Sequence, residues 1–279
     1  MNQTETPKDK LLLGIGISLA VVLLAVVIVS AVIIYNVGVA FITPFLPGEP
    51  EETLPPQPAN LYAPEDFVME DGYMRLTAGD YMLGIDVSEW NGNIDWKKVK
   101  EAGIEFVYIR IGGRGWGQAG NMYGDGMADI HYAGAKEQGL LIGAYFFSQA
   151  TNAEEAREEA QYCLDYTKDW EMDLPIVMDW EYISGEARTA GISRRDLTDA
   201  VLSFCKTINQ TGGKAALYTG WEIRQEWMYP YEVLDIPFWL AMYTTNMDYP
   251  YEFAAWQYTG SGRVPGISTD VDMNIMPVK

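Results

Sequence analysis

The sequence has few of the residues on which disulfide scaffolds, zinc sites and histidine-based active sites depend. Its 279 residues include two cysteines, Cys163 and Cys205, and a single histidine, His131. No C-x-x-C motif is present, which excludes a zinc ribbon and a thioredoxin-like redox site. Both cysteines fall in predicted helices, where two buried thiols are favoured over a disulfide. His131 is interpreted as an ordinary helix-surface or core residue, and no cofactor is expected.

Positive charge is also scarce. The chain has 19 Lys and Arg against 39 Asp and Glu, a formal net charge of -20. Nucleic-acid phosphates would be repelled by this charge, so nucleic acid is not expected as a partner. The acidity fits a domain that faces a neutral or mixed-charge ligand; the alternative is that it serves solubility alone. Hydrophobic residues make up 48% of the chain, enough for a sizeable core.

No charged residue occurs between Lys10 and Glu49. Within this gap, residues 11–35 are almost continuously apolar, longer than the roughly 18 residues that indicate a membrane-spanning helix. The run is too long for a secretory signal, although cleavage after residues 38–40 is the alternative. Lysines precede the run and glutamates follow it, which predicts a cytoplasmic N-terminus and an extracellular bulk.

The rest of the chain divides by composition. Residues 1–10 are predicted to be a cytoplasmic tail, residues 11–35 a single transmembrane helix, residues 36–79 a Pro-rich linker and residues 80–279 one folded domain. Seven of the 14 prolines lie between residues 44 and 64. Such a segment is extended, at about 3.1 Å per residue, and would hold the domain away from the membrane.

From residue 80 onward the sequence alternates between helix, glycine and apolar strand. Asn152 and Ser193 are predicted helix N-caps. Near-continuous apolar strands that alternate with helices indicate a mostly parallel sheet, and eight strands indicate a closed or nearly closed barrel. The last strands lack long helices between them, so an irregular, TIM-like β/α barrel of the α/β class is expected. The predicted strands are residues 82–87, 104–110, 140–147, 174–180, 214–218, 238–242, 254–258 and 271–275.

Acidic residues follow the apolar strands, where barrel enzymes place their catalytic groups. Asp179 and Glu181 are two apart on one strand, so both should face inward. Two close carboxylates oppose each other's ionisation, and one of them keeps a proton at neutral pH. Glycoside hydrolysis uses this combination of one protonated acid and one carboxylate. Asp86 and Asp272 end or lie in other strands and would complete a groove. Strand-end solvation and a calcium or magnesium site are the alternatives.

Aromatic residues, 13% of the chain, crowd the same strand ends. Their flat faces suit sugar rings, although each of them is also a common core residue. The glycine-rich residues 112–117 lack the phosphate-loop pattern and are interpreted as a flexible strand-to-helix loop beside the groove. The aromatic residues predicted to bind substrate are Tyr145, Tyr218, Trp180, Trp239, Tyr243 and Trp256.

Several motifs occur in an order that carries a resemblance. They are residues 84–88, 91–96, 143–148, 178–181, 217–219, 239–243, 256–258 and 264–274. On these motifs, residues 82–279 resemble glycoside hydrolase family 25, the Chalaropsis-type lysozymes. One departure is the segment 110–115, where many members have a Lys-Ala-Thr-Glu-Gly-like sequence.

The resemblance implies an irregular β/α barrel with an acidic groove and N-acetylmuramidase activity on the β-1,4 bond between N-acetylmuramic acid and N-acetylglucosamine. Glu181 matches the family's general acid. Asp179 matches the acid that orients or stabilises the substrate's N-acetyl group or the intermediate. The remaining matches are two groove acids and two groove tyrosines, Asp86, Asp272, Tyr145 and Tyr218. No metal ion is implied.

These inferences together predict a membrane-anchored, extracellular muramidase that acts on the glycan strands of peptidoglycan. Two alternatives stay open. One is a peptidoglycan-binding module that keeps the fold and has lost turnover. The other is a glycosidase of other N-acetylhexosamine polymers, such as chitin.

Overall fold

A computed structural model describes residues 56–278. The predicted cytoplasmic tail, the predicted membrane-spanning segment at residues 11–35 and residues 36–55 of the predicted linker lie outside the described residues. Within residues 56–278, no helix combines the length and the apolar character needed to cross a membrane.

Eight strands close into a mixed β-barrel in the order β3-β11-β10-β9-β8-β7-β6-β4, and a β3–β4 pairing completes the ring. Neighbouring strands are parallel except β11, which runs antiparallel to both β10 and β3. All eight predicted strands are confirmed. Their bounds are β3 (Tyr81–Val87), β4 (Phe106–Arg114), β6 (Leu141–Ser148), β7 (Ile176–Trp180), β8 (Ala215–Gly220), β9 (Phe238–Ala241), β10 (Ala255–Gly262) and β11 (Val271–Pro277).

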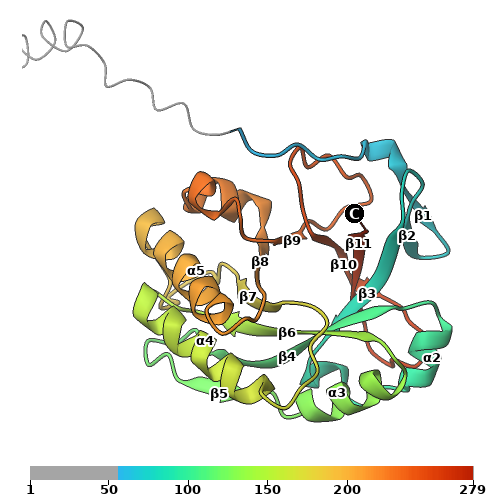
Figure 1. Ribbon diagram of the computed structural model, residues 1–279, viewed down its shortest axis with the longest axis horizontal. Coiled ribbons are helices and arrows are strands. Elements are labelled where there is room, and N and C mark those ends of the chain that lie inside the picture. Colours follow the sequence, from blue (N-terminus) through green and yellow to red (C-terminus); the bar gives the residue numbers. More distant parts are fainter. Residues whose placement is uncertain (1–55, 279) are drawn as a thin grey trace, which may run out of the picture. The chain divides into compact units, whose positions relative to one another are not determined.

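Helices lie outside the barrel beside its early strands (Figure 1). Asn152 and Ser193 accept hydrogen bonds from main-chain N–H groups of the first turns of α4 and α5, which confirms both predicted caps. Within residues 221–278 only short helices occur, so the barrel closes irregularly, as expected. The longer helices are α2 (Trp96–Glu101), α3 (Ala128–Glu137), α4 (Ala153–Thr167) and α5 (Arg194–Asn209), and the short ones include η2 (Glu89–Asn91), η3 (Ile223–Trp227) and η4 (Pro230–Val233).

A short hairpin precedes the barrel. After η1 (Pro64–Asp66), strands β1 (Phe67–Glu70) and β2 (Tyr73–Leu76) pair in antiparallel fashion. Phe67 is buried, and its ring contacts Trp256 of β10 edge-on at a centroid distance of 5.5 Å. The folded part therefore begins earlier than residue 80, within the segment expected to be linker. Asp71-Gly72 is a typical two-residue turn sequence, and it indicates this hairpin in the amino-acid sequence.

The glycine-rich segment at residues 112–117 differs from the expected flexible loop. Strand β4 continues to Arg114 and pairs with β5 (Met122–Gly124). A Cβ atom on Gly112 would lie 2.3 Å from the carbonyl oxygen of Tyr123. Gly112 therefore allows the close pairing of β4 with β5.

Aromatic side chains fill the barrel interior. The ring of Tyr108 stacks on that of Trp239 with centroids 4.4 Å apart. Added Cβ atoms on Gly84 and Gly143 would lie 2.3 Å from the rings of Phe106 and Tyr108, so glycine is required beside both rings. The interior cluster contains Phe106, Tyr108, Val177, Ala216, Tyr218, Trp239 and Ala255.

The predictions for cysteine and histidine agree with the structure. Cys163 and Cys205 are buried free thiols. His131 is buried, its Nε2 lies 3.3 Å from the Ser88 carbonyl oxygen, and its ring contacts Trp96 edge-on. His131 is thus a core residue of α3.

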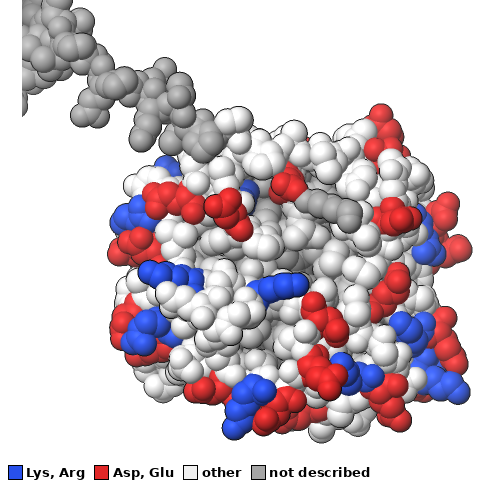
Figure 2. All heavy atoms as spheres, viewed as in Figure 1, with Lys and Arg blue, Asp and Glu red and all other residues white. Residues whose placement is uncertain are grey.

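Charged side chains are dispersed over the visible face of the protein. In Figure 2, acidic and basic groups are interspersed around the margin, and the middle carries few charges. The net negative charge of the chain is therefore not gathered into one patch on this face.

Candidate active site

The four acids singled out in the sequence meet in one cavity at the carboxyl ends of parallel strands. Asp86 of β3 lies opposite Asp272 of β11 in register, Asp179 lies on β7, and Glu181 follows the end of that strand. We call this space, of about 160 Å³, the acid cavity. Its other lining residues are Tyr145, Tyr218, Trp239, Tyr243 and Gln257.

Side-chain alternation decides which predicted aromatic residues reach the cavity. Asp179 and Glu181 face inward, so Trp180 between them faces outward, and it is fully buried in the outer core. Trp256 is buried on the same outer side, because its neighbour Gln257 faces the cavity. Both indole N–H groups donate to main-chain carbonyl oxygens. The structure therefore places neither tryptophan where it could contact a substrate in the acid cavity.

A hydrogen-bond network holds Asp86 in place. Its Oδ2 accepts from Gln257 Nε2 and from Asn274 Nδ2, each at 2.8 Å. Gln257 Oε1 accepts from the Tyr218 hydroxyl at 2.6 Å, and Asn274 Oδ1 accepts from Trp239 Nε1 at 2.8 Å. Both amide side chains are thereby oriented with their N–H groups toward Asp86.

Gln257 and Asn274 were missed as site residues in the sequence. Asn274 stands two positions after Asp272 on β11, so the alternation that placed Asp179 beside Glu181 could have found it. Gln257 lies between two aromatic residues of β10. A polar residue at an inward-facing position of such a strand indicates a site residue.

Burial raises the pKa of each acid in the cavity. It is the largest cause for Asp86, whose pKa is well above its usual range. Nearby Asp272 raises that pKa further, and the Asn274 and Gln257 hydrogen bonds oppose the rise. Burial and the charge of Glu181 raise the pKa of Asp272 to about 6. The cavity therefore holds protons at mildly acidic pH.

Asp179 and Glu181 affect each other's ionisation. Burial, the charges of Glu181 and Asp86, and a hydrogen bond with Glu181 hold the pKa of Asp179 well above its usual range. Burial also raises the pKa of Glu181, while the same hydrogen bond opposes that rise. The buried Oδ1 of Asp179 has no hydrogen-bond partner among the described residues.

One positive charge acts on this pair. Arg110 lowers the pKa of Asp179, against the larger effect of burial. Its guanidinium is fixed by Asp125, at 2.8 Å from Nε to Oδ2, and by Glu89, at 3.3 Å from Nη2 to Oε1. Arg110 opens the segment that departs from the family pattern, and its charge acts on Asp179.

A second cavity, of about 270 Å³, adjoins the acid cavity. The two share Glu181, Tyr218 and Tyr243, and Glu181 is the one of the four acids that lines both. The lining residues of the second cavity are Glu181, Tyr182, Tyr218, Gly220, Ile223, Ala241 and Tyr243. The two cavities therefore meet at these three side chains.

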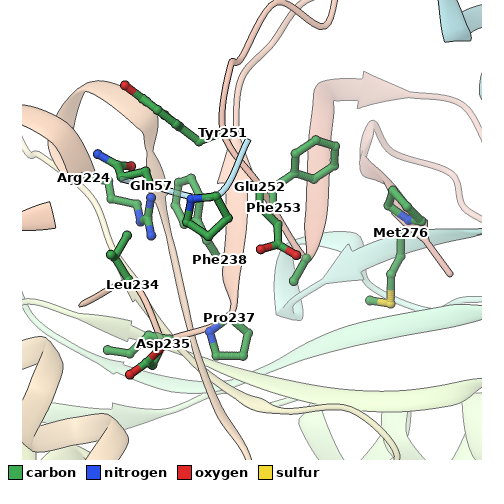
Figure 3. A pocket seen from close by; sticks show the side chains of 14 residues that line it. Gln57, Arg224, Leu234, Asp235, Pro237, Phe238, Tyr251, Glu252, Phe253 and Met276 are labelled. Atoms are coloured by element: carbon green, nitrogen blue, oxygen red, sulfur yellow. The ribbon is translucent and has the colours of Figure 1, made fainter. Parts of the chain in front are cut away.

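A third cavity, of about 430 Å³, lies beside the amino ends of β9 and β10 (Figure 3). The guanidinium of Arg224 lies over the ring of Phe238, 4.7 Å from its centroid, and donates to the Tyr249 hydroxyl. Barrel enzymes place catalysis at the opposite, carboxyl ends of the strands. We therefore take the acid cavity as the active site, although it is the smaller space.

The acid cavity contains two neighbouring carboxyl groups at the carboxyl ends of barrel strands, surrounded by tyrosine rings. This arrangement is typical of a glycoside hydrolase with a barrel fold. The sequence agrees with this class. The model of the family described as Glycosyl hydrolases family 25 matches residues 85–267, and the chain belongs to that family.

Several proteins similar to this chain are named as lysozymes. The chain is 31% identical over 202 residues to "Lysozyme M1" of Streptomyces globisporus, which covers 68% of this chain and 66% of that protein. It is 30% identical over 196 residues to "Autolytic lysozyme" of Clostridium acetobutylicum, and this match covers 69% of this chain and 55% of that protein. The chain thus spans between about half and two thirds of these relatives. The crystal structure of the bacterial lysozyme from Streptomyces coelicolor matches with a TM-score of 0.57 and 29% identity, over 71% of this chain and 92% of that one.

Proposed function

We propose that this protein is a muramidase that hydrolyses the β-1,4 bond between N-acetylmuramic acid and N-acetylglucosamine in peptidoglycan. Family membership and two relatives named as lysozymes support this activity. The observation that carries the mechanism is the position of Glu181, which lies beside Asp179 and lines both cavities.

Glu181 is the general acid. The glycosidic oxygen joins two sugars, so the group that protonates it must reach the boundary between the two sugar positions. Asp86, Asp179 and Asp272 line only the acid cavity, whereas Glu181 faces both spaces. The sugar that develops positive charge then lies in the acid cavity, where carboxylates stabilise it.

Asp179 controls the proton and the acetamido group. Its unpartnered Oδ1 is a buried acceptor that a substrate N–H can satisfy. A hydrogen bond from that N–H stabilises the ionised form of Asp179, so a proton on Asp179 moves to Glu181 when substrate binds. The oriented acetamido oxygen, or a water molecule, then attacks the sugar carbon as Glu181 protonates the leaving oxygen.

The proposal also includes location. Residues 11–35 anchor the protein in the cell membrane by a single helix, with the N-terminus in the cytoplasm and the folded domain outside. Extraction of membranes with carbonate checks this directly. An anchored protein stays in the membrane pellet, and release into the supernatant contradicts the anchor.

The activity is tested with purified peptidoglycan and with chitin. Wild type should solubilise peptidoglycan and leave chitin intact, and Glu181→Gln should lose at least about 100-fold in rate. Circular dichroism confirms that the variant is folded. Equal rates for the two proteins contradict the role of Glu181, and binding without any cleavage by wild type indicates a glycan-binding module.

A further inference from the structure

The third cavity, beside the amino ends of β9 and β10, contains a buried arginine whose charge has no counter-ion in the fold. Arg224 of η3 lines this cavity together with Leu234 and Phe238 (Figure 3), and it is only 4% exposed. Within residues 56–278, no carboxylate forms an ion pair with it. Burying a guanidinium without a counter-ion is costly, because water no longer solvates the charge. An anion in the cavity would offset this cost.

The contacts of Arg224 leave one edge of its guanidinium unused. Nη1 donates to the Tyr249 hydroxyl at 3.2 Å, and the group lies over the Phe238 ring. The buried Nε has no hydrogen-bond partner. Nε and Nη2 form one edge of a guanidinium, and their two parallel N–H groups match the two oxygens of a carboxylate. Arg224 therefore offers a bidentate position for a carboxylate.

The rest of the cavity is suited to an apolar group. Its volume of about 430 Å³ lies within the roughly 300–1,000 Å³ that is usual for small-molecule sites. Apolar surface of this kind stabilises an apolar body that leaves water. The apolar lining residues include Leu234, Ile236, Phe238, Phe253 and Met276.

Two acidic residues also line the cavity, and they favour the alternative of a bound cation. Asp235 is exposed, so water screens its charge. Glu252 is half-buried, and its main-chain N–H donates to the Pro58 carbonyl oxygen. Arg224 is the least exposed of the three charged residues, so its charge is screened least and acts most strongly on a ligand.

We propose that the third cavity is a binding site for a small organic acid. The carboxylate pairs with the Nε–Nη2 edge of Arg224, and the apolar body of the acid packs against the apolar lining. This site lies at the end of the barrel opposite the acid cavity, and it does not depend on the proposed hydrolysis of peptidoglycan.

The test compares three probes that share a six-carbon chain and differ in the head group: hexanoate, hexanamide and hexylamine. Affinity for the full chain, in a neutral detergent at pH 7.5, is measured from the rise in unfolding temperature with probe concentration. Hexanoate should bind at least about tenfold more tightly than hexanamide, because hydrogen bonds to a charged acceptor are the stronger ones. Hexylamine should bind more weakly than either.

Three results with wild type would overturn the proposal. Equal affinity for hexanamide and hexanoate would mean that the cavity binds the apolar chain alone. Tighter binding of hexylamine than of hexanoate would identify a cation site at the two acidic residues. Absence of hexanoate binding would exclude an organic-acid site. None of these comparisons requires a variant.

Substitutions then place the carboxylate on the arginine. Arg224→Met should weaken hexanoate binding at least about tenfold and leave hexanamide binding unchanged. Arg224→Gln keeps a donor for the Tyr249 hydroxyl and serves the same purpose if the methionine variant does not fold. Arg263→Met is the matched control, because Arg263 is exposed, pairs with Asp270 and lies outside the cavity; it should bind hexanoate like wild type. Hexanoate binding that persists at full strength in a folded Arg224 variant would refute the site.

Discussion

The acid cavity should cost the protein stability at neutral pH, and Asp272 offers the clearest measure of this cost. Burial is the chief cause that raises the pKa of Asp272 from its ordinary value of 3.8 to about 6. The folded state therefore binds its proton more tightly than the unfolded state, and folding stability falls as pH rises from about 4 to about 6. This rise in pKa lowers the free energy of unfolding above pH 6 by at most about 3 kcal/mol.

Asp272→Asn removes this charge. The variant should be more stable than wild type by about 1–3 kcal/mol at pH 7.5, and the gain should vanish near pH 3.5, where wild-type Asp272 is protonated in both states. Its activity should fall, because a carboxylate facing the developing positive charge is lost. The carboxylate of Asp272 is thus predicted to lower folding stability and to raise activity.

Urea unfolding of the full chain, followed by tryptophan fluorescence at pH 7.5 and at pH 3.5, measures the difference. Asp80→Asn is the control, because Asp80 is exposed and lies outside the acid cavity; its effect should stay within about 0.5 kcal/mol. A variant that is no more stable than wild type at pH 7.5, or equally stabilised at both pH values, would refute the reasoning.

Three further predictions follow from the fold and the site. Gln257→Ala should raise the pKa of Asp86 further and lower kcat, because that carboxylate loses a donor; a pH–rate profile checks both. Gly143→Ala should destabilise the fold by about 1–3 kcal/mol in urea, because its Cβ would lie 2.3 Å from the Tyr108 ring. Both cysteines should resist a thiol reagent in the folded protein and react fully in denaturant without reductant, and resistance in denaturant would indicate a disulfide.

Much of the barrel could be predicted because its signal is local. A parallel strand buried on both faces is a continuous apolar run, which is visible in the sequence without knowledge of distant contacts. The hairpin at residues 67–76 has two strands of only four residues each, which are too short to stand out from the Pro-rich segment before them. Its burial depends on contacts with β10, far along the chain.

The candidate site, too, could be predicted from the sequence only in part. Acids after apolar strands are visible in the sequence, because burying a charge is costly without a functional or structural reason. The choice among aromatic residues depends on which face of a strand each one occupies, and Trp180 and Trp256 face the outer core. The role of Gln257 depends on Asp86, 171 residues earlier, and only the closed barrel brings the two together.

The most direct test of the account is the chemical identity of the new reducing end. Peptidoglycan digested by the full chain is reduced with borohydride, and the released fragments are analysed by mass spectrometry. The account predicts reduced N-acetylmuramic acid at the new ends for wild type and none above background for Glu181→Gln. Reduced N-acetylglucosamine at those ends, or the same muramic-acid ends from both proteins, would contradict it.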